Sequence, residues 1–297
     1  MKGAVYVNGR IGDAREPLVP VFDHGFLYGE GVYETLRTYD RVPFLFDRHM
    51  RRLRASAEMI ALPVPLDDRQ LLERVEATMA VLPGPGEAYI RILLTRGVGD
   101  LSYDLSATPT PSVVVIVKPF VGPAARAVEQ GIAVATVSIL RNHPSSVNPL
   151  IKSNNLLNNA LAMQEAIRKG AEEAVMRNYR DELAECSQSN LFIVRGGAAL
   201  TPPLDAGLLP GITRAFVMEI GRDIGIPVSE ATLRLEDLLG ADEAFVTGTT
   251  RELTPVVRVD DRVIGSGRPG SITRRLLEAF HKRALEIVRR PQPQPQS

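Results

Sequence analysis

Segments typical of strands and of helices are mixed along this chain without the regular strand–helix–strand alternation of a parallel sheet. Residues 4–7 are apolar or aromatic and run into Asn8-Gly9, a strong short-range signal for a β-hairpin. A later segment has apolar residues at helical spacing, namely Met50, Leu53, Ala57 and Ile60. The mixture predicts an α+β fold and argues against a doubly wound sheet.

The same patterns predict the remaining elements. Strands are expected at residues 4–7, 10–11, 31–39, 42–46, 88–95, 112–118, 132–137, 173–176, 183–185, 191–194, 244–247 and 254–259. Helices are expected at residues 47–60, 67–79, 154–169, 213–224 and 271–289. Gly170 and the Pro83–Gly86 segment end two of these helices, because glycine and proline continue a helix poorly.

A chain of 297 residues is long enough for about two domains. The segment from Pro119 to Pro123 is typical of an interdomain linker. We therefore predict a smaller N-terminal α/β domain at residues 1–118, a linker at 119–130 and a larger C-terminal domain at 131–290. Residues 291–297 alternate Pro and Gln and cannot bury a core, so a disordered tail is expected there.

Charge and composition exclude several classes of protein. The 35 basic residues balance the 35 acidic ones, so no nucleic-acid partner is expected. The aliphatic run Val113–Val117 is far shorter than the about 20 residues of a membrane span, and the first residues lack the apolar core of a secretory signal. A single cysteine, Cys186, favours a reducing, cytoplasmic location, although its own role stays open. The 4 histidines are scattered, so no metal site is expected.

Lys152 is the lysine whose surroundings point most to chemistry. Apolar residues lead into it from Pro149, and a helix is expected to begin directly after it. Burial and a helix N-terminus both disfavour an ammonium charge, which suits a nucleophile that forms Schiff bases. The alternative is an ordinary surface lysine at the end of a strand.

Three further segments could hold charged groups. Glu185 lies between two short strands, where a carboxylate can share a proton with a ring nitrogen. Gly211 precedes a predicted helix whose free amide groups can bind an anion. The loop Thr247–Thr250 follows a strand and is rich in hydroxyl groups suited to phosphate. Each segment taken alone could equally be a solvated acid or an ordinary turn.

Taken together and in this order, these segments resemble the fold type IV pyridoxal-phosphate enzymes, the class IV aminotransferases. The likeness extends from about Tyr6 to about Leu277. It rests on five motifs and one hydroxyl residue, namely Tyr28–Arg37, His49–Ala57, Ile151–Asn159, Glu185–Phe192, Leu209–Arg214 and Thr249.

The resemblance implies pyridoxal 5′-phosphate bound between two domains, with Lys152 as the catalytic residue that forms the Schiff base. It implies that Glu185 faces the pyridine nitrogen. The other implied cofactor contacts are Arg52, Ser189, Asn190, Gly211, Ile212, Thr213 and Thr249. The implied substrate contacts are Tyr28, Tyr33, Thr35, Arg37, Tyr89, Arg91, Leu157, Thr249 and Thr250. A homodimer is expected, because members of this family share active-site residues across a subunit interface.

Three segments, Ala88–Arg91, Arg96–Leu101 and Gly267–Thr273, resemble those of branched-chain amino acid aminotransferases. This favours transfer of an amino group from a branched-chain L-amino acid (Leu, Ile or Val) to 2-oxoglutarate. Two departures leave a D-amino-acid or (R)-amine transaminase as the alternative, since Thr35 replaces a glycine and Leu157 is typical of D-amino-acid enzymes.

Two other functions are less well supported by the sequence. A 4-amino-4-deoxychorismate lyase would need a site for a second carboxylate, and no segment suggests one. A non-enzymatic binding protein would not need to keep Lys152, Glu185 and Arg52 together.

Overall fold

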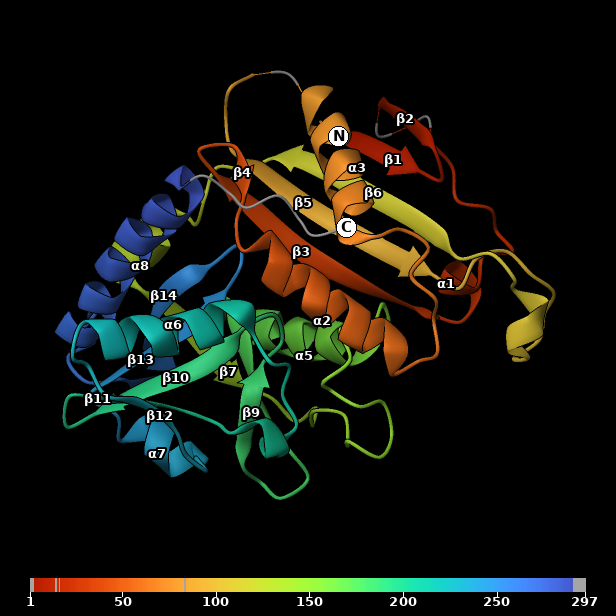
Figure 1. Ribbon diagram of the computed structural model, residues 1–297. Helices are drawn as coiled ribbons and strands as arrows, with labels where there is room; N and C mark the ends of the chain where they lie inside the picture. The colour runs from red at the N-terminus through yellow and green to blue at the C-terminus, as the bar shows by residue number, and fades with distance from the viewer. Residues whose placement is uncertain (1–2, 14, 16, 83, 291–297) are drawn as a thin grey trace. The chain divides into compact units, whose positions relative to one another are not determined.

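The computed structural model describes residues 3–13, 15, 17–82 and 84–290, and the predicted disordered tail at 291–297 lies outside this part. The chain forms two compact units (Figure 1). The first comprises Met1–Val121, Ile151–Asn155 and Leu285–Ser297, and the second comprises Gly122–Leu150 and Leu156–Ala284. The division differs from the predicted linear one, because Ile151–Asn155 joins the N-terminal unit.

The first unit is built on a six-stranded antiparallel sheet with the order β2-β1-β6-β5-β3-β4. Its strands are β1 (Ala4–Val7), β2 (Arg10–Asp13), β3 (Gly31–Tyr39), β4 (Val42–Pro43), β5 (Ala88–Thr95) and β6 (Ser112–Pro119). The long central strands β3, β5 and β6 pair over most of their length. They form a platform with two distinct faces.

Helices α2 (Phe46–Glu58) and α3 (Asp68–Ala80) cover one face of this sheet, as Figure 1 shows. Their apolar stripes bury Leu53 and Leu71 against Ile90 and neighbouring side chains of the strands. Asp67 begins α3 with a capping box, in which its carboxylate and the side chain of Gln70 satisfy each other's backbone amides. The short helix α1 (His24–Leu27) precedes β3, and a 3₁₀ turn, η1, covers Leu105–Ala107.

The second unit has a nine-stranded mixed sheet with the order β12-β11-β10-β13-β14-β7-β8-β9, and β15 pairs with β14. The strands are β7 (Ile132–Thr136), β8 (Glu173–Arg177), β9 (Leu183–Cys186), β10 (Asn190–Arg195), β11 (Ala198–Thr201), β12 (Val228–Glu230), β13 (Glu243–Gly248), β14 (Glu252–Val259) and β15 (Arg262–Val263). The helical segments are α4 (Ala125–Gln130), α5 (Leu157–Arg168), η2 (Leu204–Ala206), α6 (Ile212–Asp223), α7 (Leu235–Leu239) and α8 (Ser271–Arg289), of which α8 continues into the first unit from Leu285.

The structure confirms the α+β class, and it corrects three predicted elements. The helix expected at 154 begins at Leu157, because Ser153 pairs with Val32 and the Asn154 amide donates to the Gly31 carbonyl. The strand expected at 42–46 stops at Pro43, because Leu45 adopts a left-handed conformation with φ 51° that turns the chain into α2. The expected linker at 119–130 contains helix α4. Within the described ranges, no helix has the length and apolar character needed to cross a bilayer.

Candidate active site

Lys152 is held in the first unit by β3 and α2. Its amide donates to Ser56 Oγ at 3.1 Å, and its carbonyl accepts from the Tyr33 amide at 2.9 Å. The Lys152 Nζ lies 4.6 Å from the centroid of the Tyr33 ring. The predicted position at a helix N-terminus is wrong, since α5 begins only at Leu157. The side chain is instead placed by a strand-like segment beside β3.

One face of the β3–β5 pair collects most of the predicted substrate contacts. Side chains alternate between the faces of a strand, so Tyr33, Thr35 and Arg37 share one face of β3. Thr35 pairs with Arg91 and Arg37 pairs with Tyr89, so these residues of β5 lie on the same face. The Arg91 guanidinium carbon lies 4.0 Å from the Tyr33 ring centroid. The Lys152 amine and the Arg91 guanidinium therefore both lie close to the Tyr33 ring.

Arg37 is more enclosed than the other members of this face. Its side chain is buried, and its Nε donates to the Thr38 carbonyl at 3.2 Å. Its guanidinium carbon lies 4.0 Å from the Tyr39 ring centroid and 4.6 Å from that of Phe120. These aromatic rings orient the cation within the strand.

The opposite face of β3 buries a carboxylate, Glu34, against α2. Arg52 donates from Nε to Oε1 at 2.7 Å and from Nη2 to Oε2 at 2.8 Å, and His49 Nδ1 lies 2.7 Å from Oε2. Burial opposes ionisation of Glu34, but the Arg52 charge and the His49 contact outweigh it and hold the carboxyl pKa far below its usual range. Burial lowers the pKa of His49. Glu34 therefore stays ionised and fixes the plane of the Arg52 guanidinium.

Glu34 and His49 are functional candidates that the sequence analysis did not select. Glu34 could have been recognised from the alternation of side chains along β3. It falls between Val32 and Leu36 on the side that faces the core. A charged residue on that side needs a buried partner. The helical spacing of α2 placed Arg52 but did not identify that partner.

Glu185 is the corresponding buried acid of the second unit. Arg141 Nε donates to Oε1 at 2.7 Å, and the Asn190 Nδ2 and the Leu209 amide each donate to Oε2 at 3.2 Å. The ion pair with Arg141 is almost fully buried, with 9% and 6% of the two side chains exposed. Sequence reasoning missed Arg141, because it lies 44 residues from Glu185 along the chain. Three donors hold this carboxylate in place.

The start of α6 has backbone amides of the kind that bind anions. Gly211 is the N-cap residue, and among the residues that the structure describes no side chain caps the first amides of this helix, which include those of Ile212 and Thr213. A Cβ at Gly211 would lie 1.8 Å from Asn190 Oδ1, so any other residue there requires Asn190 or the start of α6 to move. Asn190 thus ties this helix start to Glu185.

The hydroxyl groups of the Thr247–Thr250 loop and of Ser189 differ in burial and in hydrogen bonding. The buried Thr247 Oγ1 has no hydrogen-bond partner among the residues that the structure describes. Thr249 and Thr250 follow β13 and are partly exposed. The Ser189 hydroxyl donates to the buried Glu173 at 3.0 Å, which holds the turn between β9 and β10. Thr247 belongs to the loop that the sequence analysis proposed for phosphate, whereas Glu173 is a further polar residue that it did not select.

Two predicted substrate contacts lie away from these clusters within their own units. Leu157 begins α5 with 65% of its surface exposed. Tyr28 follows α1, where its ring packs 4.9 Å from His24 and 5.0 Å from Tyr103.

The single cysteine is buried, and the histidines form no metal-binding cluster among the residues that the structure describes. Burial raises the pKa of the Cys186 thiol well above its usual value, so the side chain behaves as a small buried apolar group. In the part of the chain covered by the structure, no three His, Cys, Asp or Glu side chains gather in a metal-binding arrangement.

Comparison with known proteins shows which family this chain resembles. Residues 31–259 match the family described as amino-transferase class IV. A Methanocaldococcus jannaschii protein with the provisional name branched-chain-amino-acid aminotransferase is 39% identical over 279 residues, covering 93% of this chain and 94% of that protein. A D-alanine aminotransferase of Staphylococcus haemolyticus is 35% identical over 283 residues, covering 94% of this chain and 96% of that protein. An aminodeoxychorismate lyase of Bacillus subtilis is also similar, at 31% identity over 285 residues, which is 96% of each chain.

Solved structures agree with the sequence matches. The branched-chain amino acid aminotransferase of Escherichia coli superposes with a TM-score of 0.89 at 32% identity, covering 96% of this chain and 95% of that one. Another branched-chain aminotransferase, solved with pyridoxamine 5′-phosphate, superposes with a TM-score of 0.90 at 30% identity, covering 98% of this chain and 96% of that one. The chain therefore belongs to the class IV aminotransferases, which are pyridoxal-phosphate-dependent enzymes.

Proposed function

We propose that this protein transfers an amino group from a branched-chain L-amino acid to 2-oxoglutarate. The observation that carries the proposal is the meeting of Lys152 Nζ and the Arg91 guanidinium at the Tyr33 ring. An aminotransferase needs a primary amine for C=N chemistry beside a cation for the substrate α-carboxylate. The similarity to proteins named branched-chain aminotransferases supports the donor class.

The donor groups of the chain fit pyridoxal 5′-phosphate. Lys152 offers a primary amine, the uncapped start of α6 offers amides for a phosphate, and Glu185 offers a carboxylate for a ring nitrogen. The buried hydroxyl of Thr247, which has no partner within the described ranges, is a further place for a bound polar group. When bound, the cofactor supplies an electron sink that stabilises negative charge at the substrate Cα.

In the proposed mechanism Lys152 would hold the cofactor through Nζ, and once a donor amine has displaced it, the released Nζ would accept the proton from the substrate Cα. Glu185 would accept a hydrogen bond from the cofactor's ring nitrogen, and its buried ion pair with Arg141 holds the carboxylate in place. Phosphate binding is assigned to Arg52, Gly211, Ile212, Thr213 and Thr249. Ser189 and Asn190 support this arrangement through Glu173 and Glu185.

The substrate is assigned to the shared face of β3 and β5. Arg91 and Arg37 provide positive charge for the α-carboxylate, and Tyr33 and Tyr89 provide aromatic walls. Thr35 narrows the space for a donor side chain, because it adds a branched side chain where a glycine would leave room. Tyr28, Leu157 and Thr250 complete the proposed set.

A D-amino-acid transaminase is the second candidate. The 35% identity to a D-alanine aminotransferase and the presence of Leu157 favour it. The expected homodimer and cytoplasmic location remain predictions.

Single-donor half-reactions distinguish the two candidates. The cofactor-loaded protein is mixed separately with L-leucine, L-valine, D-alanine, D-glutamate and (R)-1-phenylethylamine, and the loss of visible cofactor absorption is followed. Fast loss with L-leucine and L-valine, followed by recovery with 2-oxoglutarate, supports the proposal. Fast loss with the D-amino acids or the (R)-amine, together with slow L-donors, overturns it in favour of the second candidate.

A further inference from the structure

Glu173 is a buried carboxylate of the second unit that contacts the turn between β9 and β10. Its side chain is fully buried at the start of β8. Its Oε1 accepts from the Ala174 amide at 2.9 Å, from the Ser187 amide at 3.1 Å and from the Ser187 hydroxyl. Its Oε2 accepts from the Ser189 hydroxyl at 3.0 Å. Both oxygens therefore bind the turn that follows β9, the strand that carries Glu185.

The backbone of this turn is also held by contacts that do not involve Glu173. The Ser187 amide donates to a carbonyl of β8 at 3.0 Å, and the Cys186 amide donates to the Ser189 carbonyl at 2.7 Å. The Asn159 Nδ2 donates to the Ser187 carbonyl at 2.7 Å. These bonds set the path of the turn, so the carboxylate of Glu173 is free to have a further role.

That further role involves a second loop, which Glu173 reaches through Arg251. Arg251 is the last residue of the short connection between β13 and β14, and its Nη2 lies 3.6 Å from Glu173 Oε2. The same nitrogen donates to the Glu172 carbonyl at 3.2 Å. In the sheet β14 and β8 are separated by β7, so no strand pairing links these two segments. The Arg251 side chain therefore ties the β13–β14 connection to the start of β8.

The β13–β14 connection, Thr249–Arg251, carries the hydroxyl groups assigned to the phosphate and to the substrate. Its shape is fixed within the hairpin, where the Arg251 amide donates to the Gly248 carbonyl at 3.1 Å. The hairpin also packs on the β9–β10 turn, because a Cβ at Gly248 would lie 3.6 Å from the Gln188 carbonyl oxygen. The hairpin sets the shape of the connection, whereas its placement against the turn depends on this packing and on Arg251.

The groups that face the two oxygens of Glu173 differ in what they can donate or accept. Backbone amides can only donate, and both of the amides that Glu173 binds face Oε1. The Arg251 guanidinium can also only donate, and it faces Oε2. The Ser189 hydroxyl can donate or accept. A glutamine at position 173 would therefore keep its oxygen towards the amides and place its NH₂ group against Arg251.

We propose that Glu173 and Arg251 are positioning residues that together hold the Thr249–Arg251 connection against the β9–β10 turn. The consequence for the cofactor rests on the proposed function, which assigns Thr249 to the phosphate. The contact between the two side chains sets where the Thr249 hydroxyl lies. Both residues thus act on phosphate binding through the loops that they join.

A double-mutant cycle in cofactor affinity tests this inference. The parent, Glu173→Gln, Arg251→Gln and the double variant are loaded with pyridoxal 5′-phosphate and equilibrated at decreasing free cofactor, and visible absorption gives Kd. Each single substitution should raise Kd by roughly tenfold, the size of one lost hydrogen bond to a charged group. The double variant should bind no more weakly than the weaker single variant, because both substitutions remove the same contact. Fold-changes that multiply in the double variant would overturn the inference.

Pyridoxal, which lacks the phosphate, separates a positioning role from a general structural one. The connection that Arg251 ties down is assigned to the phosphate, so the Kd for pyridoxal should be the same in the parent and in the variants. A loss of equal size for both compounds would show that Glu173 and Arg251 do not act through the phosphate. That result would also overturn the inference.

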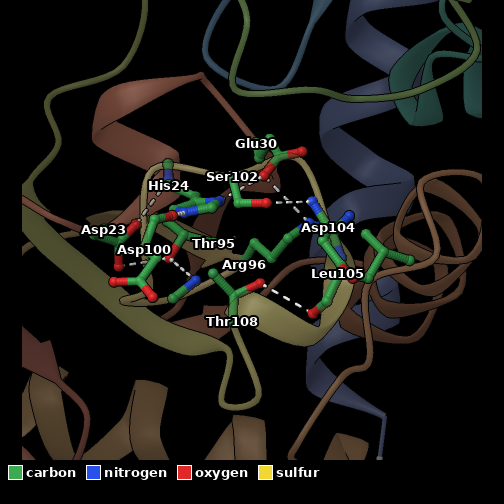
Figure 2. A network of polar contacts seen from close by, with 12 residues as sticks. Asp23, His24, Glu30, Thr95, Arg96, Asp100, Ser102, Asp104, Leu105 and Thr108 are labelled. Carbon is green, nitrogen blue, oxygen red and sulfur yellow. Dashed lines mark hydrogen bonds and ion pairs between the residues drawn. The ribbon is translucent and has the colours of Figure 1, made fainter.

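Asp23→Asn is the matched control for Glu173→Gln. Asp23 is a fully buried carboxylate of the first unit, and Figure 2 shows it in a polar network with Thr95. It accepts from the Thr95 hydroxyl and from the Gly25 amide, both at 2.8 Å. The substitution therefore alters a similar set of contacts in the unit that does not contain Thr249–Arg251. Its Kd for pyridoxal 5′-phosphate should equal that of the parent.

Arg126→Gln is the matched control for Arg251→Gln. Arg126 forms an exposed ion pair with Glu172, the residue before Glu173, so its loss should leave Kd unchanged. If Glu173→Gln does not fold, Arg251→Gln decides alone, since 25% of the Arg251 side chain is exposed and its replacement leaves the buried carboxylate in place. A parent-like Kd for pyridoxal 5′-phosphate in Arg251→Gln would then overturn the inference.

These measurements contain no amino donor, so they separate the inference from the proposed function. If L-leucine is not a donor, the proposed function fails, while the double-mutant cycle still decides the roles of Glu173 and Arg251. If L-leucine is a donor and the fold-changes multiply, only the roles of Glu173 and Arg251 fail.

Discussion

Arg52 binds Glu34 through two parallel hydrogen bonds, from Nε to Oε1 at 2.7 Å and from Nη2 to Oε2 at 2.8 Å. Glu34 is fully buried, and 11% of the Arg52 side chain is exposed. These two parallel bonds fix the plane of the guanidinium group, because its Nε and Nη2 both donate to Glu34. Glu34 therefore holds the Arg52 guanidinium in one orientation beside β3.

Replacing Glu34 with Gln should destabilise the protein strongly. Removing one member of a buried ion pair leaves the other charge uncompensated and costs about 3–5 kcal/mol. Urea unfolding monitored by circular dichroism measures the change in the free energy of unfolding. The matched control is Glu73→Gln, whose exposed pair with Arg69 on α3 should contribute less than about 1 kcal/mol. Equal effects of the two substitutions would contradict the role assigned to the buried pair.

The same carboxylate predicts how stability depends on pH. The pKa of Glu34 is held below its usual range in the folded protein, whereas in the unfolded chain it returns to about 4.3. The stabilisation is therefore fully present above that value and is lost as the pH falls towards the folded pKa. Unfolding free energies measured between neutral and acidic pH should fall more steeply in the parent than in Glu34→Gln. Parallel curves would show that Glu34 does not carry this dependence.

Replacing Gly211 with Ala should weaken cofactor binding. Its Cβ would lie 1.8 Å from Asn190 Oδ1, so Asn190 or the start of α6 must move. Overpacking of this kind costs about 1–3 kcal/mol. Titration with pyridoxal phosphate, followed by absorbance, measures the change in Kd. Gly86→Ala is the control, because no atom lies within 4 Å of its added Cβ. An unchanged Kd in Gly211→Ala would show that this helix start does not bind the phosphate.

Replacing Arg141 with Gln should lower kcat. The Glu185 carboxylate would lose the buried cation that holds it in place, so it would bind a protonated ring nitrogen less well. The visible absorption of the bound cofactor should therefore show an altered pH profile, which a purely structural loss would not produce. Arg195→Gln removes an exposed ion pair with Asp237 in the same unit and should leave both properties unchanged. A normal pH profile in Arg141→Gln would count against this coupling.

Replacing Thr35 with Gly should increase activity on L-leucine relative to L-alanine. Thr35 lies on the proposed substrate face opposite Arg91, and its removal makes room for a longer donor side chain. The ratio of kcat/KM for the two donors measures the effect, which should be about tenfold or more for this difference in side-chain size. Ser229→Gly, on the exposed edge strand β12, controls for added backbone freedom. An unchanged ratio would remove the steric argument.

Much of the site could be predicted because its parts are local in sequence. The alternation of β3 places Tyr33, Thr35 and Arg37 on one face whatever the rest of the chain does. The helical spacing of α2 separates a buried Leu53 from a more accessible Arg52. Gly211 before an apolar helical pattern marks the start of α6. Each of these properties follows from a backbone period or from a single residue type.

The partners of these residues were set by tertiary structure. The amide of Lys152 donates to Ser56 Oγ, 96 residues away, and this pairing draws Lys152 into a strand-like segment where a helix start was predicted. Arg141 reaches Glu185 across 44 residues, and His24 reaches the Asp100 carbonyl across 76.

The sequence by itself thus determined the α+β class, most element types and the chemical kinds of group available. Only the folded structure decided which buried charge pairs with which, because that choice depends on strand register and helix packing between distant segments. The spacing of residues along one strand or helix does not specify such a pairing. A buried charge is nevertheless costly unless an opposite charge lies beside it.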